Sequence, residues 1–280
     1  MKIPHLYRTP LAIAVMSAAA SPLTHAGISD RIKDGLDDAT STFTVAGPAT
    51  TTSALQNPEL AQDEEGDFVV VWQQGGFADY DIKLQRYESD GDPIDTSPLT
   101  VASSGGSTTH IEPTVAVDDD GNAVVAWNKQ DPNNSGCTGN IVRRSLSAGN
   151  DSFGSERDVP SGTPTLSSSY CDPEIARDAD GDYVVVWEDE GGSETDVLFR
   201  QFNASGAPQD PQQRLSNTSS SDNRRDPDVA MSDSGSFIAA WQSTQSSVGK
   251  RIFARRFGAS GAALDDEFRL DNRALGAPDG

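Results

Sequence analysis

Acidic side chains on alternate residues form the most distinctive chemical pattern of this chain. They recur around a glycine in three short segments, and such spacing presents carboxylate and amide oxygens to one point, as a calcium ion requires. The candidate ligands are Asp63, Glu65 and Asp67; Asp118, Asp120 and Asn122; and Asp178, Asp180 and Asp182. A fourth segment, Ser232 to Ser236, has lost most of these oxygens, which indicates a turn that folds without metal. Two interpretations therefore stand, a calcium site and an ordinary Asp-Gly hairpin, and the hairpin is the commoner.

Histidine and arginine limit the catalytic chemistry that the chain can support. His110 is the only histidine beyond the N-terminal segment, which excludes catalytic triads and histidine-rich zinc sites. Its Ser/Gly/Thr-rich surroundings predict a solvated loop. Sialidase-type chemistry would need arginines that converge on the substrate, but here one arginine recurs in every repeat, which favours ion pairs with the acidic turns. These arginines are Arg86, Arg144, Arg200 and Arg256.

Glycoside hydrolysis needs two carboxylates at a set separation. The chain has 43 acidic residues, so a pair can always be found and its presence decides nothing. No nucleotide-binding loop is apparent either. The residue types therefore have to be judged by the elements that position them.

Four segments of the chain align without gaps. Each begins with a proline and reaches a tryptophan 14 residues later, with an alanine and a glycine at fixed positions between them. The segments are 58–72, 113–127, 173–187 and 227–241. All four tryptophans of the chain fall in this one column. They could form aromatic platforms for sugars, but a regular column behind an apolar run favours packing between repeats.

Each repeat predicts four antiparallel strands. The proline opens a first strand with small alanines, and an Asp-Gly turn leads to a second strand that is apolar without alternation, so both of its faces are covered. A third strand, a second glycine turn and a short fourth strand complete the unit. Four strands in about 55 residues is the size of a propeller blade, whereas a β-sandwich needs roughly 100 residues. The sequence therefore predicts an all-β fold, either a four-bladed β-propeller or a propeller-like arc of four-stranded blades, with the first strands innermost.

The repeats also define the domain organisation. A four-repeat β domain covers 42–272, with repeats that start near 58, 113, 173 and 227. Residues 1–26 have the basic, apolar and small-residue regions of a signal peptide, 27–41 form a linker, and 273–280 form a tail. A spare fourth-type strand is expected at Thr42–Val45. The blades are therefore expected either to close alone as a monomer or to form a homodimer that completes the ring.

Export to the periplasm or the medium is predicted from the signal peptide, with cleavage after Ala26. Cys137 and Cys171 are the only cysteines, and an exported even pair is typical of a disulfide. In a blade meander their two loops emerge on the same side, so the bridge is expected to join the second repeat to the third. The net charge of −22 repels nucleic acid, and no later stretch is long and apolar enough to span a membrane.

The repeat pattern Pro-x-[Val/Ile/Leu]-Ala-x-Asp…Gly-[Asp/Asn]-x-Val-Val-[Val/Ala]-Trp resembles repeats of large secreted bacterial surface proteins. The resemblance covers 42–272 and implies a propeller-like structure outside the cell. Integrin-type FG-GAP repeats, sialidase Asp-boxes and quinoprotein docking motifs are similar only in part. Tyr183 stands at the second glycine of the FG-GAP calcium loop, and Trp72 lies too far from Gly66 for an Asp-box. No catalytic residue carries over.

Two functions from different classes follow. The first is a non-catalytic module that binds or adheres to an extracellular glycan or protein, with no cofactor unless the turns hold calcium. The second is a secreted propeller-type hydrolase, glycosidase or sialidase-like. A hydrolase should break the repeat symmetry with unique loops that carry acids or tyrosine. Only the insertion Asn128 to Asn140 does so, and its distinctive residue is Cys137, so the sequence favours the binding module.

Overall fold

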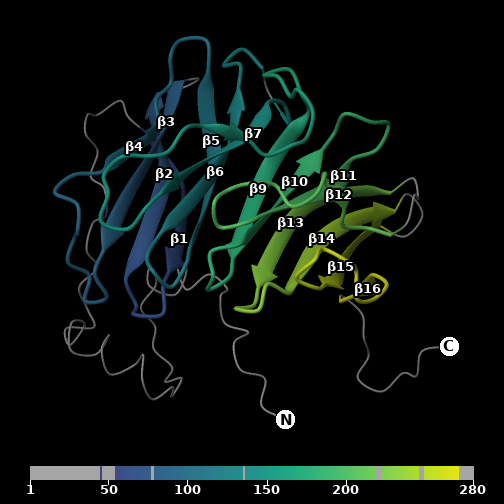
Figure 1. Ribbon diagram of the computed structural model, residues 1–280. Coiled ribbons are helices and arrows are strands. Elements are labelled where there is room, and N and C mark those ends of the chain that lie inside the picture. The colour runs from purple at the N-terminus through teal and green to yellow at the C-terminus, as the bar shows by residue number, and fades with distance from the viewer. Residues whose placement is uncertain are drawn as a thin grey trace.

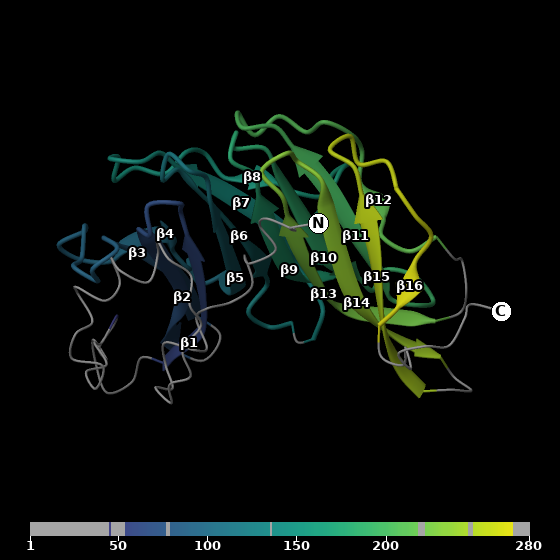
Figure 2. The same ribbon diagram turned by 90° about the horizontal axis from the view of Figure 1, so that it is seen from below.

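The computed structural model is all-β and describes residues 45, 54–76, 79–134, 136–217, 222–245 and 249–270. The described strands form four antiparallel sheets, each of four strands that are consecutive in the sequence. The sheets follow one another around an arc, and we number them blades 1 to 4 (Figures 1 and 2). The prediction of four four-stranded blades is confirmed.

The strand bounds are as follows. Blade 1 contains β1 (Ala54–Gln62), β2 (Phe68–Gly76), β3 (Asp79–Tyr87) and β4 (Leu99–Ala102). Blade 2 contains β5 (Thr109–Val117), β6 (Ala123–Gln130), β7 (Asn140–Leu146) and β8 (Arg157–Asp158). Blade 3 contains β9 (Tyr170–Arg177), β10 (Tyr183–Asp189), β11 (Asp196–Phe202) and β12 (Gln213–Arg214). Blade 4 contains β13 (Asn223–Met231), β14 (Phe237–Gln245), β15 (Gly249–Phe257) and β16 (Phe268–Arg269).

The first strand of each blade is innermost, as the small alanines predicted. β1 lies beside β5, β5 beside β9 and β9 beside β13, whereas β8 and β12 lie toward the outer rim (Figure 2). Three apolar clusters join blade 1 to 2, blade 2 to 3 and blade 3 to 4. Among the described residues, no such cluster joins blade 4 to blade 1. The described blades therefore form an open arc.

The second strands form the core between the blades. β6 and β10 are buried on both faces because a neighbouring blade covers each face. All four tryptophans are 3% exposed or less, which confirms packing and rules out surface platforms for sugars. In β14 the two faces differ: Phe237, Ala239 and Trp241 are buried, while Ile238 and Ala240 are only half-buried.

The inner strands differ from the prediction at their prolines. Each strand begins three or four residues before the proline, and the strand pairing shifts register there. The residue that precedes the proline has a φ between 49° and 54° in every blade; these residues are Asn57, Glu112, Asp172 and Asp226. Proline lacks the N–H that a regular ladder needs, and a β-bulge accommodates the interruption. The proline therefore marks a bulge inside the strand and not its start.

His110 corrects a second expectation. It lies on β5 and is 3% exposed, not on a solvated loop. The Trp127 indole N–H donates to His110 Nδ1 at 2.9 Å, so Nε2 carries the proton and donates to the Ser103 carbonyl at 3.2 Å. Burial lowers the pKa of His110. The polar composition around it misled the prediction, because packing between blades 1 and 2 covers the start of β5.

The predicted disulfide is present. Cys137 lies between β6 and β7 of blade 2, Cys171 lies on β9 of blade 3, and their Cα atoms are 5.1 Å apart. The bridge therefore links neighbouring blades, as the meander topology required. It also lies directly beside Asp172, one of the four described residues other than glycine that have a positive φ.

Replacing both cysteines by serine should lower the free energy of unfolding by about 3–4 kcal/mol, because the bridge closes a loop with a sequence separation of 34. Urea unfolding of the oxidised protein and of the double variant measures the difference. Wild type unfolded in the presence of a reductant is the control and should match the variant. Equal unfolding midpoints for all three would contradict the prediction.

Several predicted segments lie outside the described residues: the signal peptide 1–26, the linker 27–41, residues 42–44 of the spare strand and the tail 273–280. Val45, the last residue of the spare strand, is described and packs against blade 1. Within the described ranges no helix is long and apolar enough to cross a membrane.

Candidate active site on the arc axis

The four bulges bring two columns of polar residues to the inner side of the arc. The residues before the prolines are Asn57, Glu112, Asp172 and Asp226, and those after them are Glu59, Thr114, Glu174 and Asp228. Six of these eight residues are acids. Bulges and strained backbone concentrate at functional sites because they re-aim side chains that a regular strand would place elsewhere. The arc axis is therefore the candidate site.

Hydrogen bonds between blades hold the bulged residues in place. Gln73 of blade 1 accepts the backbone N–H of Glu112 at 3.2 Å. Glu112 in turn accepts the N–H of Asp172 at 3.0 Å, and Glu188 accepts the N–H of Asp226 at 2.6 Å. Each bulged residue of blades 2 to 4 is thus fixed by a side chain of the preceding blade. Blade packing, rather than any flexible loop, positions the axial carboxylates.

Asp172, Glu188 and Asp226 form the densest acidic group, which we call the axial trio. One carboxylate oxygen of each lies within 4.8 Å of the other two. Glu188 is 3% exposed, Asp172 is half-buried and Asp226 is exposed. Gln242 donates to the Asp226 carboxylate. The trio therefore runs from the interior of blade 3 to solvent at blade 4.

Burial raises the pKa of two members of the axial trio. The pKa of Glu188 rises to about 7 because of desolvation and the nearby charges of Asp172 and Asp226, although the Asp226 N–H and Arg225 lower it. The pKa of Asp172 rises to about 6 because of desolvation, Glu112 and Asp226. Carboxyl groups with raised pKa values beside an exposed carboxylate provide the elements of general acid and base chemistry.

Glu174, further along the axis, is another carboxyl group whose pKa is raised. Burial raises its pKa to about 8, and the charge of Glu59 adds to this, while a hydrogen bond from the Thr114 hydroxyl at 3.0 Å lowers it. The pKa of Glu59 is itself raised by burial and by Asp228. Blades 1, 3 and 4 thus face one another across the axis through their acids.

The sequence contained a signal for this site that the prediction missed. The residue that follows the tryptophan is Gln73, Asn128, Glu188 and Gln242 in successive repeats. Three are neutral amides and one is an ionisable acid, so Glu188 breaks the repeat symmetry. The prediction searched for symmetry breaking in long loops, whereas it lies in a single strand residue.

The predicted metal ligands in the Asp-Gly turns have other partners. In each turn, the side chain of the first acid accepts a hydrogen bond from the backbone N–H of the residue four positions later. The pairs are Asp63 with Asp67 at 2.9 Å, Asp118 with Asn122 at 2.8 Å and Asp178 with Asp182 at 2.8 Å. The middle acids, Glu65, Asp120 and Asp180, are exposed. In the described part of the chain, three acid, histidine or cysteine side chains do come close enough to share a metal ion in two places. Both places lie outside these turns. Calcium at the turns stays a prediction.

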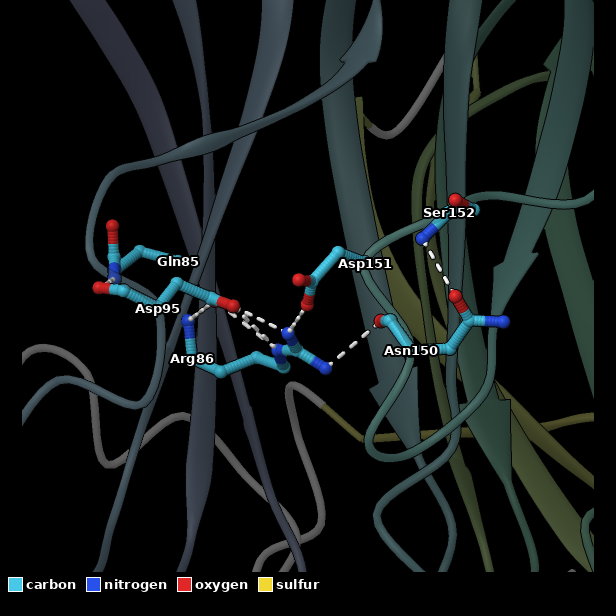
Figure 3. A network of polar contacts seen from close by, with 6 residues as sticks. All are labelled: Gln85, Arg86, Asp95, Asn150, Asp151 and Ser152. Carbon is cyan, nitrogen blue, oxygen red and sulfur yellow. Dashed lines mark hydrogen bonds and ion pairs between the residues drawn. The ribbon is translucent and has the colours of Figure 1, made fainter.

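The recurring arginines do not converge on the axis. Arg86 binds Asp95 of its own blade and the Asp151 side chain and Asn150 carbonyl of blade 2 (Figure 3). Arg256 binds Asp265, whereas the other two bind carbonyls: Arg144 that of Val101 at 2.7 Å and Arg200 that of Val159 at 2.9 Å. The expected pairing with the Asp-Gly turns is wrong for all four. A sialidase-like arginine cluster is not formed by these residues.

Several solved structures are similar to this chain in fold. An endo-arabinase from Bacteroides thetaiotaomicron has a TM-score of 0.49 and 14% identity over 78% of this chain and 81% of that chain. An endo-arabinanase from Bacillus licheniformis has a TM-score of 0.47 and 14% identity over 75% and 77%. The fold is propeller-like. No protein-family model and no curated protein sequence matches the chain.

Other similar structures are longer than this chain. A Penicillium chrysogenum α-L-arabinanase complexed with arabinobiose has a TM-score of 0.46 and 15% identity, and this chain covers 64% of it. An ulvan lyase has a TM-score of 0.47 and 12% identity, with 56% of its length covered. The chain thus spans less than two thirds of these two proteins.

Proposed function

We propose that this chain is an exported hydrolase of glycosidic bonds and that the axial trio carries the reaction. One observation supports this most directly: Asp172, Glu188 and Asp226 lie within 4.8 Å of one another, with the pKa raised to about 6 at Asp172 and about 7 at Glu188. Glycoside hydrolysis needs one carboxyl group that donates a proton and a second that acts as a carboxylate.

This proposal corrects the preference for a non-catalytic binding or adhesion module. The structures with a similar fold are arabinanases, a lyase and neuraminidase-like proteins by their titles, and this overturns the preference drawn from the sequence in favour of its alternative, the propeller-type hydrolase. The axial geometry supplies the physical reason. Glu188 breaks the repeat symmetry at a site that the equivalence of the blades did not lead us to expect.

The residues of the axial trio divide the work according to exposure. Half-buried Asp172 is the general acid, which protonates the leaving oxygen and afterwards accepts a proton from water. Exposed Asp226 reaches the sugar and acts as the nucleophile. Buried Glu188 holds the N–H of Asp226 and is a positioning residue. A separation near 5 Å between acid and nucleophile is typical of retaining enzymes, and we expect retention of the anomeric configuration.

The charge of the axis favours a neutral glycan as the substrate. Acids from blades 1, 3 and 4 face the axis and repel anionic sugars. The cation nearest the axial trio, Arg225, already contacts Glu188 at 3.4 Å and pairs with Glu190. The sialidase-like form of the hydrolase hypothesis therefore has less support than the glycosidase form.

A polysaccharide assay with the mature protein tests the proposal. We expect release of reducing ends from a neutral polysaccharide such as arabinan, and little or none from ulvan or sialylated glycans. The assay is repeated after chelation, since the proposed chemistry uses no metal and activity should persist. No release from any neutral polysaccharide would contradict the proposed function, and release from anionic glycans alone would contradict the charge argument.

A further inference from the structure

The fourth strands show how one blade covers the next. In blades 1 to 3, an apolar residue at or next to the end of the fourth strand is 0% exposed and belongs to the cluster shared with the following blade. Its carbonyl accepts a hydrogen bond from an arginine of that blade. The pairs are Val101 with Arg144 at 2.7 Å, Val159 with Arg200 at 2.9 Å and Leu215 with Arg255 at 3.1 Å. Three internal interfaces therefore share one design.

Leu270 is the counterpart of these residues in blade 4. Its N–H donates to the Ile252 carbonyl at 2.8 Å, just as Val159 donates to Ile141 and Leu215 donates to Val197. Yet Leu270 is 51% exposed. The third-strand partners behave in the same way, since Ile141 and Val197 are 0% exposed and Ile252 is 40% exposed. Blade 4 thus keeps the interface design, although no other described blade covers it.

Exposed large apolar residues concentrate in blade 4. The described residues include four exposed large hydrophobic side chains. Three of them lie in blade 4, namely Ile252, Leu264 and Leu270, and the fourth is Ile94. Ile252 pairs with Gln242, next to Trp241 on β14, and so lies on the face opposite to Trp241. Trp241 packs against blade 3. The open face therefore points away from the rest of the arc.

Arg256 adds an incomplete ion-pair network to the open face. In blade 1 the equivalent Arg86 binds Asp95 of its own blade and reaches Asn150 and Asp151 of the next blade (Figure 3). Arg256 keeps the first contact through Asp265, and its side chain is 57% exposed. The half of the network that a following blade supplies has no counterpart among the described residues.

Blade 1 carries the complementary surface at the other end of the arc. Val70, Trp72 and Tyr87 form a cluster that belongs to no neighbouring blade, and Val45 packs on it. The Tyr87 hydroxyl donates to the Val45 carbonyl at 3.3 Å. Val45 thus packs on blade 1 in the way that Val101 packs on blade 2. The surface that receives a fourth-strand residue is therefore present on blade 1, and Val45 is the described residue that packs on it.

We propose that the open face of blade 4, made of Ile252, Leu270 and Arg256, docks onto blade 1 of a second copy of this chain. Leu270 then replaces the second copy's Val45 beside its Tyr87. The contact is head-to-tail and continues the three interfaces already present within the chain. This interface does not depend on the proposed hydrolase activity.

Charge complementarity supports a second copy as the occupant. On the open face, β15 carries two basic residues, Lys250 and Arg256, in a chain of net charge −22. The turn after β3 in blade 1 carries exposed Glu88, Asp90 and Asp92. Asp92 follows Gly91 as Asn150 follows Gly149, so it occupies the position that Arg86 contacts in blade 2. Opposite charges therefore meet across the proposed contact.

Sedimentation of the mature protein over a concentration series tests the proposal. Wild type should self-associate, and Leu270→Asp should raise the dissociation constant roughly tenfold or more, because a charge replaces the central apolar residue. Thr163→Asp is the control, an exposed position on the connection between blades 2 and 3 and away from both proposed contact surfaces, and should associate like wild type. Circular dichroism confirms that each variant is folded. A wild type that stays monomeric at every concentration would overturn the proposal, since a ring closed within one chain would behave in this way.

A charge exchange distinguishes the head-to-tail contact from a symmetric one. Arg256→Glu and Asp92→Lys should each weaken self-association severalfold, because each creates a like-charge pair across the contact. An equal mixture of the two variants should form mixed assemblies, since the carboxylate introduced in one variant then meets the ammonium group introduced in the other. A mixture that remains as weakly associated as its components would refute the head-to-tail arrangement.

Discussion

Replacing Asp172 by asparagine is expected to lower kcat/KM on the neutral polysaccharide by about 10²–10⁴-fold, because an amide cannot donate the proton that the leaving oxygen requires. The backbone should tolerate the change. Asp172 has a φ of 51°, and asparagine is among the residues that adopt this conformation most readily. The chain itself places Asn57 at the equivalent position of blade 1, with a φ of 49°.

The pH profile of the wild type identifies the role of Asp172. A general acid must hold its proton, and burial with the charge of Glu112 and Asp226 raises the pKa of Asp172 to about 6. Activity should therefore fall as the pH rises above about 6, and the residual activity of Asp172→Asn should lose this dependence. Asp180→Asn is the control, since it removes an exposed acid of the same blade and should leave kcat/KM unchanged. If Asp172→Asn keeps wild-type activity, the assignment is wrong.

The parts of the fold that the sequence predicted are those that repeat. A large tryptophan behind an apolar run has to be buried in each copy, so its column specifies the second strand and the interface between blades. The disulfide followed from the same meander, because Cys137 and Cys171 fall at the same end of neighbouring blades. Such features depend on local pattern and on one rule of connection.

The arc and the axial site could not be predicted from the repeat pattern, because they depend on contacts between residues that are distant in the sequence. Whether blade 4 meets blade 1 is decided by a single interface that no repeat encodes. The axial trio depends on bulges that turn the residues beside each proline toward the axis. A regular strand, in which side chains alternate between the two faces, would point these side chains in other directions. The predicted pairing of the recurring arginines with the acidic turns was wrong for a related reason. Arg86 pairs with Val69, whereas Arg144 pairs with Val125, the counterpart of Val70, so a one-residue offset puts them on opposite faces.

Glu174→Gln is expected to stabilise the protein at pH 8 and to flatten the dependence of its stability on pH. Burial and Glu59 raise the pKa of Glu174 from 4.5 to about 8 in the folded state. Between these values the folded chain holds a proton that the unfolded chain has released. The free energy of unfolding therefore falls as the pH rises through this window. Glutamine keeps the size of the side chain and still accepts the Thr114 hydrogen bond, but it carries no charge to desolvate, so we expect a gain on the order of 2 kcal/mol at pH 8.

Urea unfolding at pH 5, 6.5 and 8 measures this difference. Asp172 and Glu188 also have raised pKa values and add a slope of the same sign to wild type and variant alike. His110 acts in the opposite direction, because burial lowers its pKa below 6.5, so its contribution is lost as the pH falls below that value. Since these groups are common to both proteins, the difference between the two curves isolates Glu174. Exposed Glu64→Gln serves as the control and should run parallel to wild type, and a Glu174→Gln curve that also runs parallel would show that the buried acid does not hold its proton.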